Sequence, residues 1–595
     1  MIPLEVRLRS RRSRTWRTFR KPTAVLQATR AEEVAGCLAE VDHAVRRDGC
    51  YAAGFVTYEA AAAFGLPVHQ PVPGALPLVC FGLFHPSSVD AEPALAPAGT
   101  YRTGEWRPSI DEAAYAEAIH RIKQLIEAGD TYQINFTFRF NAECSGDPLA
   151  LLRDLDAAQD GPWGAYVDDG RHAICSASPE LFFRLEGDRL ECRPMKGTIA
   201  RGLWAAADEA QAACLRASEK NRAENVMVVD MVRNDLGRIA RTGTVQVTSL
   251  FDVERYPLQW QMTSSVSARA QAGLPEIFAS LFPSGSVTGA PKHRSMSIIR
   301  DLESGPRGIY TGAIGCLSPH GRAQFNVAIR TIAIDRQHGT AEFGVGSGIV
   351  WDSVDRDEYD ECRLKASVLL KRPAFSYAAG PDPGFRLLET IGWTRTEGFA
   401  LLSRHLDRLR ESAACFGFEC DLEEVRRLLE SAVSGLAGPS KVRVLAGRDG
   451  AIECEGIDLG PPGDRPVRVA LAAEAIDPVD VFLYHKTTRR GVYERARASR
   501  PEADAVLLWN GRGEVTEATE ANVVVELDGE KLTPPIACGL LAGTLRAALL
   551  EEGVVIERRI SVADLDRATG LWLINSVRGW LPATLLKPTT RAAHR

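Results

Sequence analysis

The stretch Glu219–Leu236, EKNRAENVMVVDMVRNDL, has the spacing of a helix with one apolar face. Positions 224, 227, 228 and 231 share that face, and three of them are apolar. The fourth is Glu224, a carboxylate that is costly on such a face unless it is paired, protonated or bound to a metal. Two interpretations stay open here, a structural glutamate bonded to nearby backbone and a ligand in a pocket.

A second helix is predicted over residues 355–367, DRDEYDECRLKAS, directly after the glycine-rich run GVGSGIV. Glu358, Glu361 and Lys365 fall on one face of it. By itself this pattern is typical of a surface glutamate–lysine pair. The three preceding glycines allow backbone amides to approach a ligand closely. Two carboxylate-bearing helices beside such backbone would suit Mg²⁺, which prefers oxygen ligands and shares them with anionic substrates.

Between these features and the N-terminus lies Pro194-Met-Lys-Gly-Thr198, where Lys196 is expected in a short turn between apolar runs. Most lysines in turns are simply solvated, so this motif alone predicts no function.

The order of several segments resembles that of the chorismate-utilising enzymes, the family of anthranilate, aminodeoxychorismate, isochorismate and salicylate synthases. The segments are SASPE, RPMKGT, AENVMVVDMVRNDLGR, GSVTGAPK, IYTGAIG, FNVAIRT and GVGSGIVWDS with EYDECRLKA, over about residues 105–370. So many collinear segments make chance agreement very improbable. The resemblance implies a mixed α and β domain in which two facing sheets, flanked by helices, surround one pocket.

The resemblance also assigns roles. Glu224 and Glu361 correspond to Mg²⁺ ligands, with Glu358 beside them. The residues that correspond to the chorismate cradle are Thr288, Gly289, Tyr310, Arg330, Gly346, Gly348 and Lys365. A guanidinium such as that of Arg330 can bind a carboxylate through two parallel hydrogen bonds.

Two positions distinguish among the reactions of the family. Anthranilate synthases have alanine where Lys196 stands, whereas aminodeoxychorismate synthases have the lysine, which is thought to attack the ring at C2 before ammonia enters at C4. That role requires a neutral amine and so a pKa lowered by burial. Family members that add water have a lysine base at the position of Gln133. Both positions indicate ammonia as nucleophile and C4 as its target.

The resemblance further assigns proton transfer to Glu180, sixteen residues before Lys196. Many relatives have a histidine near the departing hydroxyl, and here Gln261 occupies that place. A glutamine can hydrogen-bond a leaving group but cannot protonate it, so Glu180 is the expected general acid. The other interpretation of Glu180 is a surface carboxylate at a strand edge.

No Gly-x-Cys-x-Gly glutaminase motif occurs in the chain. We therefore expect it to use free ammonia or to bind a separate glutamine amidotransferase.

The proline- and glycine-rich stretch Arg372–Gly384 lacks periodicity and is predicted to be a linker. It separates an expected synthase domain over residues 1–371 from a second domain over residues 385–595, also of mixed α and β type. In that second domain His485-Lys486-Thr-Thr-Arg-Arg490 is strongly cationic. Neighbouring positive charges lower the pKa of a lysine and attract phosphate, although a basic surface patch would have the same composition.

The segments FRLLETIGW, SRHLDRLRESA, LYHKTTRRGVYE, EVTEATEANVVV, LLAGTLR and INSVRG resemble the fold-type IV enzymes that use pyridoxal phosphate (PLP), over about residues 384–590. That family includes branched-chain and D-amino acid aminotransferases and aminodeoxychorismate lyase, and it implies a fold of two subdomains. By resemblance, Lys486 binds PLP covalently and Glu517 pairs with the pyridinium nitrogen. The residues that correspond to the phosphate site are Arg408, Gly543, Thr544 and Ser576, two of them at a predicted helix start.

Together the resemblances imply that the chain converts chorismate to aminodeoxychorismate and then to 4-aminobenzoate and pyruvate, using Mg²⁺ and PLP. One alternative is an anthranilate-type synthase fused to an amino acid aminotransferase, against which Lys196 argues. The other is a synthase with a non-catalytic C-terminal module, against which Lys486, Glu517 and Arg408 argue. A homodimer through the PLP domain is compatible with the resemblance.

The composition is that of a soluble globular protein, with 45% hydrophobic and 25% charged residues among 595. The net charge of −6 gives no indication of a nucleic-acid partner, and no apolar run is long enough to span a membrane. The thirteen scattered cysteines form no metal-binding pattern and indicate reduced thiols in the cytoplasm. Eight basic residues and no acidic one lie between Arg7 and Lys21; the segment has no apolar core of a secretory signal, and it is expected to be a solvated arm or an organelle-targeting segment.

Overall fold

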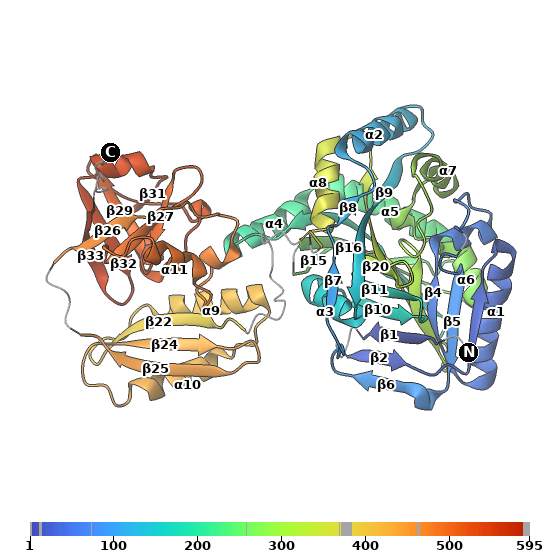
Figure 1. The fold of residues 1–595 in the computed structure, drawn as a ribbon, viewed down its shortest axis with the longest axis horizontal. Coiled ribbons are helices and arrows are strands. Elements are labelled where there is room, and N and C mark those ends of the chain that lie inside the picture. Colours follow the sequence, from blue (N-terminus) through green and yellow to red (C-terminus); the bar gives the residue numbers. More distant parts are fainter. Residues whose placement is uncertain are drawn as a thin grey trace. The chain divides into compact units, whose positions relative to one another are not determined.

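The structure, a computed structural model, describes residues 3–10, 15–72, 74–257, 259–367, 369–370, 384–460 and 465–586. The chain divides into two compact units, one formed by Met1–Arg201 with Gln211–Arg372 and the other by Gly202–Ala210 with Pro373–Arg595 (Figure 1). The predicted linker at Arg372–Gly384 lies, apart from Gly384 itself, outside the described residues. Each unit is of mixed α and β structure, as the sequence predicts.

The first unit contains two large, mainly antiparallel sheets. The first sheet has the order β17 (Gly289–Ala290), β9 (Gln133–Gly146), β21 (Thr340–Ile349), β20 (Thr331–Asp335), β11 (His172–Ser178), β10 (Trp163–Asp168), β1 (Glu5–Arg9), β2 (Trp16–Phe19) and β6 (Val89–Glu92), with β7 (Tyr101–Thr103) and β8 (Arg107–Pro108) paired to β9. The second has the order β14 (Met195–Ala200), β16 (Gln259–Arg269), β13 (Arg189–Arg193), β12 (Leu181–Glu186), β19 (Arg322–Val327), β18 (Ala313–Ser318), β4 (Tyr51–Val56), β5 (Val79–Phe84) and β3 (Ala24–Ala28), with β15 (Gln246–Arg255) paired to β16.

The two sheets face each other across a shared core. Val6 and Val167 of the first sheet pack in one apolar cluster with Phe55 and Phe84 of the second. Further clusters fill the space between each sheet and its helices. The helices of this unit are α1 (Ala31–Asp48), α2 (Glu112–Glu127), α3 (Pro148–Gln159), α4 (Ala205–Ala217), α5 (Glu219–Gly237), α6 (Leu274–Leu281), α7 (Lys292–Leu302) and α8 (Asp355–Lys365), with the start of α4 grouped in the other unit.

Two local expectations are changed by the structure. Lys196 lies in strand β14 and not in a turn, because residues 195–200 pair with β16. The helix at Glu219–Leu236 is confirmed as α5 and Glu224 is buried in it, but the buried face is centred on Asn225, Val229 and Val232, and Met227 and Met231 are only half-buried.

The second unit has two sheets and their helices. The smaller sheet has the order β23 (Gly398–Phe399), β22 (Leu387–Thr394), β24 (Ser440–Ala446) and β25 (Ile452–Asp458), with α9 (Leu402–Phe416) packed on β22 and α10 (Leu422–Val433) on β24 and β25. The larger has the order β28 (Val515–Ala518), β27 (Ala505–Trp509), β26 (Val467–Leu471), β33 (Gly579–Leu585), β32 (Gly570–Asn575), β29 (Asn522–Leu527), β30 (Glu530–Thr533) and β31 (Ile556–Glu557), with α11 (Gly491–Ala498) and α12 (Thr544–Glu551).

The segment Gly202–Ala210 belongs to this second unit although it follows β14 in the sequence. Trp204 stacks on Tyr484 with ring centroids 5.2 Å apart, and both belong to one apolar cluster. The start of α4 is thus grouped with the second unit.

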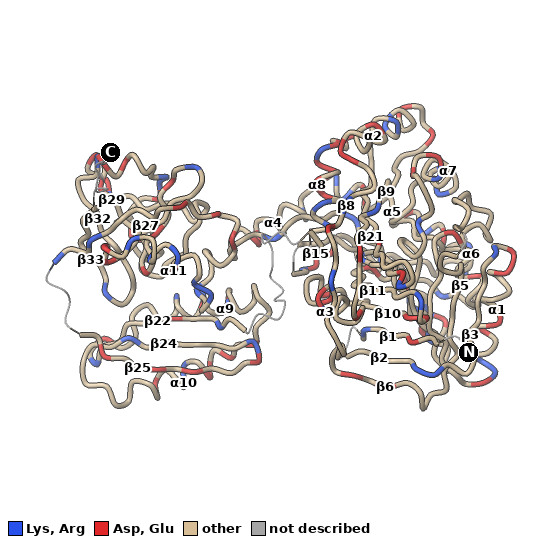
Figure 2. Tube along the Cα trace, in the orientation of Figure 1, with Lys and Arg blue, Asp and Glu red and all other residues tan. Residues whose placement is uncertain are grey.

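Lys and Arg residues are interspersed with Asp and Glu residues along the trace of both units (Figure 2). Among the described residues, no helix combines the length and the apolar character needed to cross a bilayer.

Candidate active sites

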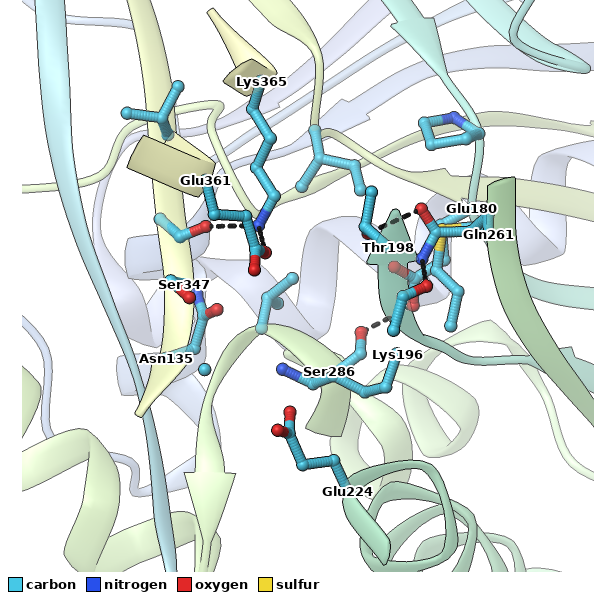
Figure 3. A pocket seen from close by; sticks show the side chains of 18 of the residues that line it. Asn135, Glu180, Lys196, Thr198, Glu224, Gln261, Ser286, Ser347, Glu361 and Lys365 are labelled. Carbon is cyan, nitrogen blue, oxygen red and sulfur yellow. Dashed lines mark hydrogen bonds and ion pairs between the residues drawn. The ribbon is translucent and has the colours of Figure 1, made fainter. Parts of the chain in front are cut away.

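The first unit encloses a cavity of about 120 Å³ between its two sheets (Figure 3). Strand β14 lines it from one sheet and β21 from the other, and α5 and α8 complete the wall. Most residues predicted for the synthase site meet here, namely Glu180, Lys196, Glu224, Tyr310, Arg330, Gly346, Gly348, Glu358, Glu361 and Lys365. The structure does not bring Thr288 and Gly289 to this wall; Ser286 and Val287 line it instead.

Lys196 extends into the cavity from an irregular part of β14. Met195 pairs with Thr263 and Thr198 with Gln261, so the register shifts at Lys196 and at Gly197, whose φ is +90°. Such bulges redirect side chains. Gly348 provides the room, because a Cβ added there would lie 2.6 Å from Lys196 Nζ. Burial lowers the pKa of Lys196, and the charge of nearby Glu224 opposes that shift.

Glu224, on α5, lies next to Lys196, and Figure 3 shows its carboxyl group directed toward the lysine amine. Its nearest hydrogen-bond donor is Gln133 Nε2, 3.4 Å from Glu224 Oε2. Burial raises the pKa of Glu224 to about 7, and the charge of Lys196 counteracts only part of this effect. A bound cation would stabilise its ionised form.

The two carboxylates of α8 are engaged differently. Glu361 forms an ion pair of 2.6 Å with Lys365, whose Nζ also donates to Gly346 O at 2.8 Å. Glu358 accepts from the hydroxyls of Ser347 and Ser353 and from Lys220 Nζ. In the described parts of the chain, no three acidic, histidine or cysteine side chains are close enough to hold a metal by themselves. Glu224 and Glu361 fit Mg²⁺ only as partial ligands, which agrees with its habit of sharing substrate and water oxygens.

Glu180 is buried beside the cavity, where Ser286 Oγ donates to its Oε1 at 2.5 Å. Burial raises the pKa of Glu180 to about 7, while Ser286 and Lys196 lower it. The strand-edge surface interpretation of Glu180 is wrong, because only 2% of the residue is exposed. Sequence reasoning missed Ser286, although it lies within the segment GSVTGAPK.

Arg330 is buried among neutral partners. It donates to Gln159 Oε1 and, over 2.9 Å, to Gln259 Oε1. Gln259 donates in turn to Gln261, which bonds Thr198 and the carbonyl of Gly197. Burial lowers the pKa of Arg330 to about 10. Because these hydrogen-bond partners are neutral amides, the guanidinium suits an anionic ligand.

The second unit contains a cavity of about 590 Å³. All six residues predicted for the PLP site line it: Arg408, Lys486, Glu517, Gly543, Thr544 and Ser576. Burial, together with the charge of Arg408, lowers the pKa of Lys486 to about 8. The cationic segment around Lys486 therefore lowers this pKa less than predicted, since the largest effect of a charge comes from Arg408 on α9 and not from Arg490.

Glu517 is held on β28 by Tyr493 and Asn522. Tyr493 Oη donates to Oε1 at 2.8 Å, and Asn522 Nδ2 approaches Oε2 at 3.3 Å. Burial raises the pKa of Glu517 to about 7. A cationic ring nitrogen would stabilise the ionised carboxylate, so this residue fits a pyridinium partner.

Donors suited to a phosphate group gather at the start of α12. Gly543 is the N-cap residue of that helix, and Thr544 begins it. Arg408 donates to Ala542 O at 3.0 Å and forms two hydrogen bonds of 2.7 Å with Glu389. Helix starts of this kind bind anions through backbone amides. Glu389 and the adjacent His405 were not predicted from the sequence.

Residues 5–371 match the family described as chorismate binding enzyme. The chain belongs to that family. Residues 386–586 match the amino-transferase class IV family, so a class IV domain follows the chorismate-binding domain.

Two relatives are each similar to less than half of this chain. Aminodeoxychorismate synthase component 1 of Bacillus subtilis (strain 168) is 39% identical over 265 residues, which cover 44% of this chain and 56% of the relative. Anthranilate synthase component 1 of Thermus thermophilus is also 39% identical, over 268 residues that cover 45% of this chain and 58% of the relative. The chain thus spans less than two thirds of these relatives, and identity alone does not separate their reactions.

A solved structure of anthranilate synthase component I from Streptococcus pneumoniae is similar as well. It is 25% identical, with a TM-score of 0.50, and the match covers 62% of this chain and 93% of that chain. The predicted fold of the first domain is confirmed.

Proposed function

We propose that the first unit aminates chorismate to 4-amino-4-deoxychorismate and that the second removes pyruvate to leave 4-aminobenzoate, a folate precursor. The observation that carries the first step is that Lys196 lines the cavity of the chorismate-binding domain. Anthranilate formation needs no lysine at this position, whereas attack on the ring needs a buried amine with a lowered pKa.

Two residues carry out the bond changes of the first step, Lys196 as the nucleophile and Glu180 as the acid. The neutral amine of Lys196 forms a bond to ring carbon C2, the ring double bonds shift, and the C4–oxygen bond breaks. Glu180, protonated below about pH 7, gives its proton to the departing hydroxyl, which leaves as water. Ammonia then bonds to C4, the C2–nitrogen bond breaks, and Lys196 is released. Arg330 binds a substrate carboxylate and orients the ring.

The pKa of Glu180 predicts how amination depends on pH. Because burial raises this pKa to about 7, the acid form is lost as pH rises through that value. We expect the ratio of kcat/KM for chorismate in wild type to that in Glu180→Gln, both expressed per concentration of neutral ammonia, to fall above about pH 7, because the titration of Lys196 is common to the two proteins. At pH 7 the variant should be at least about 10²-fold less active than wild type. A ratio that does not change with pH would assign the titration to another group.

Mg²⁺ would be held by Glu224 and Glu361, with Glu358 nearby, and would neutralise substrate carboxylate charge. We expect Glu224→Gln and Glu361→Gln each to raise the Mg²⁺ concentration for half-maximal amination at least about tenfold, since each removes one of few ligands. Asp230→Asn, an exposed carboxylate on the same helix as Glu224, is the matched control. If all three variants titrate with Mg²⁺ as wild type does, both glutamates have only a structural role.

The ammonia source proposed for this chain is a separate glutamine amidotransferase or ammonium itself. Relatives named component 1 imply a further component, and this chain has no Gly-x-Cys-x-Gly motif. Both routes are distinguished by comparing glutamine, with and without an added amidotransferase, against ammonium salts.

PLP would be held in the second unit by Arg408, Gly543, Thr544 and Ser576, with Lys486 as its covalent partner and Glu517 at its ring nitrogen. When bound, it would supply an electron sink for the carbon that carries the amino group. Lys486 would remove the proton from C4 of the ring. The C3–oxygen bond then breaks, the ring becomes aromatic, and the released enol takes a proton to become pyruvate.

Three further cations on the rim of this cavity favour the lyase over an amino acid aminotransferase. Lys441 and Arg443 lie two residues apart on β24, and Arg578 donates to Gly460 O at 2.9 Å. In the described part of the chain none of the three forms an ion pair with a carboxylate. Aminodeoxychorismate has two carboxylates, whereas simple amino acids have one.

We expect Lys441→Gln combined with Arg578→Gln to raise the KM for aminodeoxychorismate about 10- to 100-fold, because a hydrogen bond to a charged group contributes about 1.5–3 kcal/mol. Lys531→Gln, an exposed lysine of the same unit, is the control. Pyruvate release from aminodeoxychorismate is the measurement, and an unaltered KM would remove this argument for the lyase.

The proposal as a whole is tested by supplying chorismate, ammonium and Mg²⁺ to the purified chain, with and without PLP. We expect 4-aminobenzoate and pyruvate only with PLP, and aminodeoxychorismate without it. Anthranilate as the product would favour the anthranilate-type alternative, and aminodeoxychorismate under both conditions would favour a non-catalytic second unit.

A further inference from the structure

His405 connects the hydroxyls of the proposed phosphate site to a buried carboxylate. Its Nδ1 lies 2.7 Å from Glu389 Oε2, and its Nε2 lies 2.9 Å from Ser576 Oγ and 3.2 Å from Thr544 Oγ1. Both His405 and Glu389 are buried, at 1% and 2% exposure. Ser576 and Thr544 line the cavity, whereas His405 and Glu389 do not. The histidine therefore acts from behind the cavity wall.

The contacts determine where the ring proton lies. Arg408 donates two hydrogen bonds to Glu389 and lowers the pKa of that carboxyl strongly, so the carboxylate is ionised and can only accept. His405 Nδ1 must then carry the proton and donate it to Glu389. In a neutral ring Nε2 has no proton, and its single lone pair accepts a hydroxyl proton, with Ser576 Oγ the nearer of the two donors.

A neutral His405 is the expected state before an anion binds. The groups that face it are Glu389 from β22, Arg408 from its own helix, and Lys486. Burial lowers the pKa of His405, and Arg408 and Lys486 act in the same direction, while Glu389 opposes them. With Nε2 accepting, the Ser576 hydroxyl directs its proton toward the histidine and its oxygen lone pairs toward the cavity. That orientation repels a phosphate.

We propose that His405 is a positioning residue that takes up one proton when a phosphate group enters this site. A proton from solvent on Nε2 reverses the hydrogen bonds, so that Nε2–H donates to the hydroxyl oxygens. Ser576 and Thr544 can then donate to the phosphate, and no buried polar group is left without a partner. If both hydroxyls turned toward the phosphate without proton uptake, Nε2 would lose its donor inside the protein.

This inference rests on the proposed PLP site and predicts a linkage between phosphate affinity and pH. Because the phosphate-bound form carries one more proton, affinity should weaken as pH rises, by up to about tenfold per unit while His405 is neutral before binding and charged after it. The second pKa of a phosphate is about 6, so measurements between pH 7 and 8.5 keep the ligand itself a dianion.

The test uses pyridoxamine 5′-phosphate, which cannot form a covalent link to Lys486, and pyridoxamine, which lacks the phosphate. Calorimetric titrations of the full chain in two buffers with different ionisation enthalpies give the protons taken up. We expect wild type to take up close to one proton more than His405→Gln with pyridoxamine 5′-phosphate, and no more than His405→Gln with pyridoxamine. The pH dependence of Kd should be correspondingly flatter in the variant.

Two variants separate positioning from folding. In His405→Gln the side-chain amide can donate permanently toward the hydroxyls but does not titrate, so binding should persist without the pH effect. Arg410→Gln, a change at an exposed residue of the same helix, should behave as wild type. Equal proton uptake in wild type and His405→Gln would overturn the proposal. If wild type binds pyridoxamine 5′-phosphate no better than pyridoxamine, the proposed cofactor site itself fails.

Discussion

Replacement of Lys196 by alanine is expected to lower the rate of aminodeoxychorismate formation by about three orders of magnitude or more, as removal of a nucleophile does elsewhere. The physical reason lies in the surroundings of the amine. Lys196 is directed into the cavity, and burial lowers the pKa of its amine, so the alanine variant loses the nucleophile that the proposed reaction needs. Alanine leaves binding by Arg330 intact, so the loss should appear in kcat more than in the KM for chorismate.

Lys196→Arg is the matched variant. It keeps a positive charge beside Glu224 but offers no neutral amine at neutral pH. If Lys196 acts only by its charge, the arginine variant should retain much of the activity; if it attacks the ring, both variants should be equally impaired. The assay supplies chorismate, ammonium and Mg²⁺ and measures aminodeoxychorismate and anthranilate separately. Full synthase activity in Lys196→Ala would exclude covalent catalysis.

The helices of the first site could be predicted from sequence because helical spacing is local. The predicted carboxylates of α5 and α8 do line one cavity. Sequence spacing does not predict which strand pairs with the strand of Lys196. Strand β14 pairs with β16, about sixty residues further along the chain, and the bulge that directs the amine into the cavity arises from that pairing. The Glu180–Ser286 hydrogen bond spans 106 positions and was missed for the same reason.

Thr288 illustrates the limit of assigning residues by motif. Its neighbours Ser286 and Val287 reach the cavity, but the Thr288 hydroxyl donates to Ser284 O at 3.1 Å and is fully buried. A motif predicts which segment approaches the substrate, and backbone geometry decides which of its side chains faces inward. Its role in binding chorismate, like that of Gly289, stays a prediction.

In the second unit the sequence predicts the lining residues but not what supports them. Lys486, Glu517 and the start of α12 all border the cavity. Glu389 and His405 lie behind it, on different elements, and their side chains meet only after β22 and α9 pack. Buried polar networks of this kind have no sequence period, so only the folded structure identifies them.

Replacement of Lys486 by alanine is expected to stop 4-aminobenzoate formation while the synthase reaction continues. The variant loses both the covalent partner of the cofactor and the base that would take the C4 proton. The pKa of Lys486, about 8, leaves part of its amine neutral near neutral pH. The rate of pyruvate release should fall by several orders of magnitude. Cofactor should still bind through Arg408 and the start of α12, without the visible absorbance of a covalent lysine adduct.

Two comparisons make this result specific. Lys531→Ala removes an exposed lysine that lies over Trp572 and Trp580 in the same unit, and it should leave both products at wild-type amounts. In Lys486→Ala, aminodeoxychorismate should accumulate at the rate at which wild type consumes chorismate, because Lys486 lines only the second cavity. Both products are followed with chorismate, ammonium, Mg²⁺ and PLP supplied. Wild-type amounts of 4-aminobenzoate from the variant would refute the role of Lys486 and the proposed lyase reaction with it.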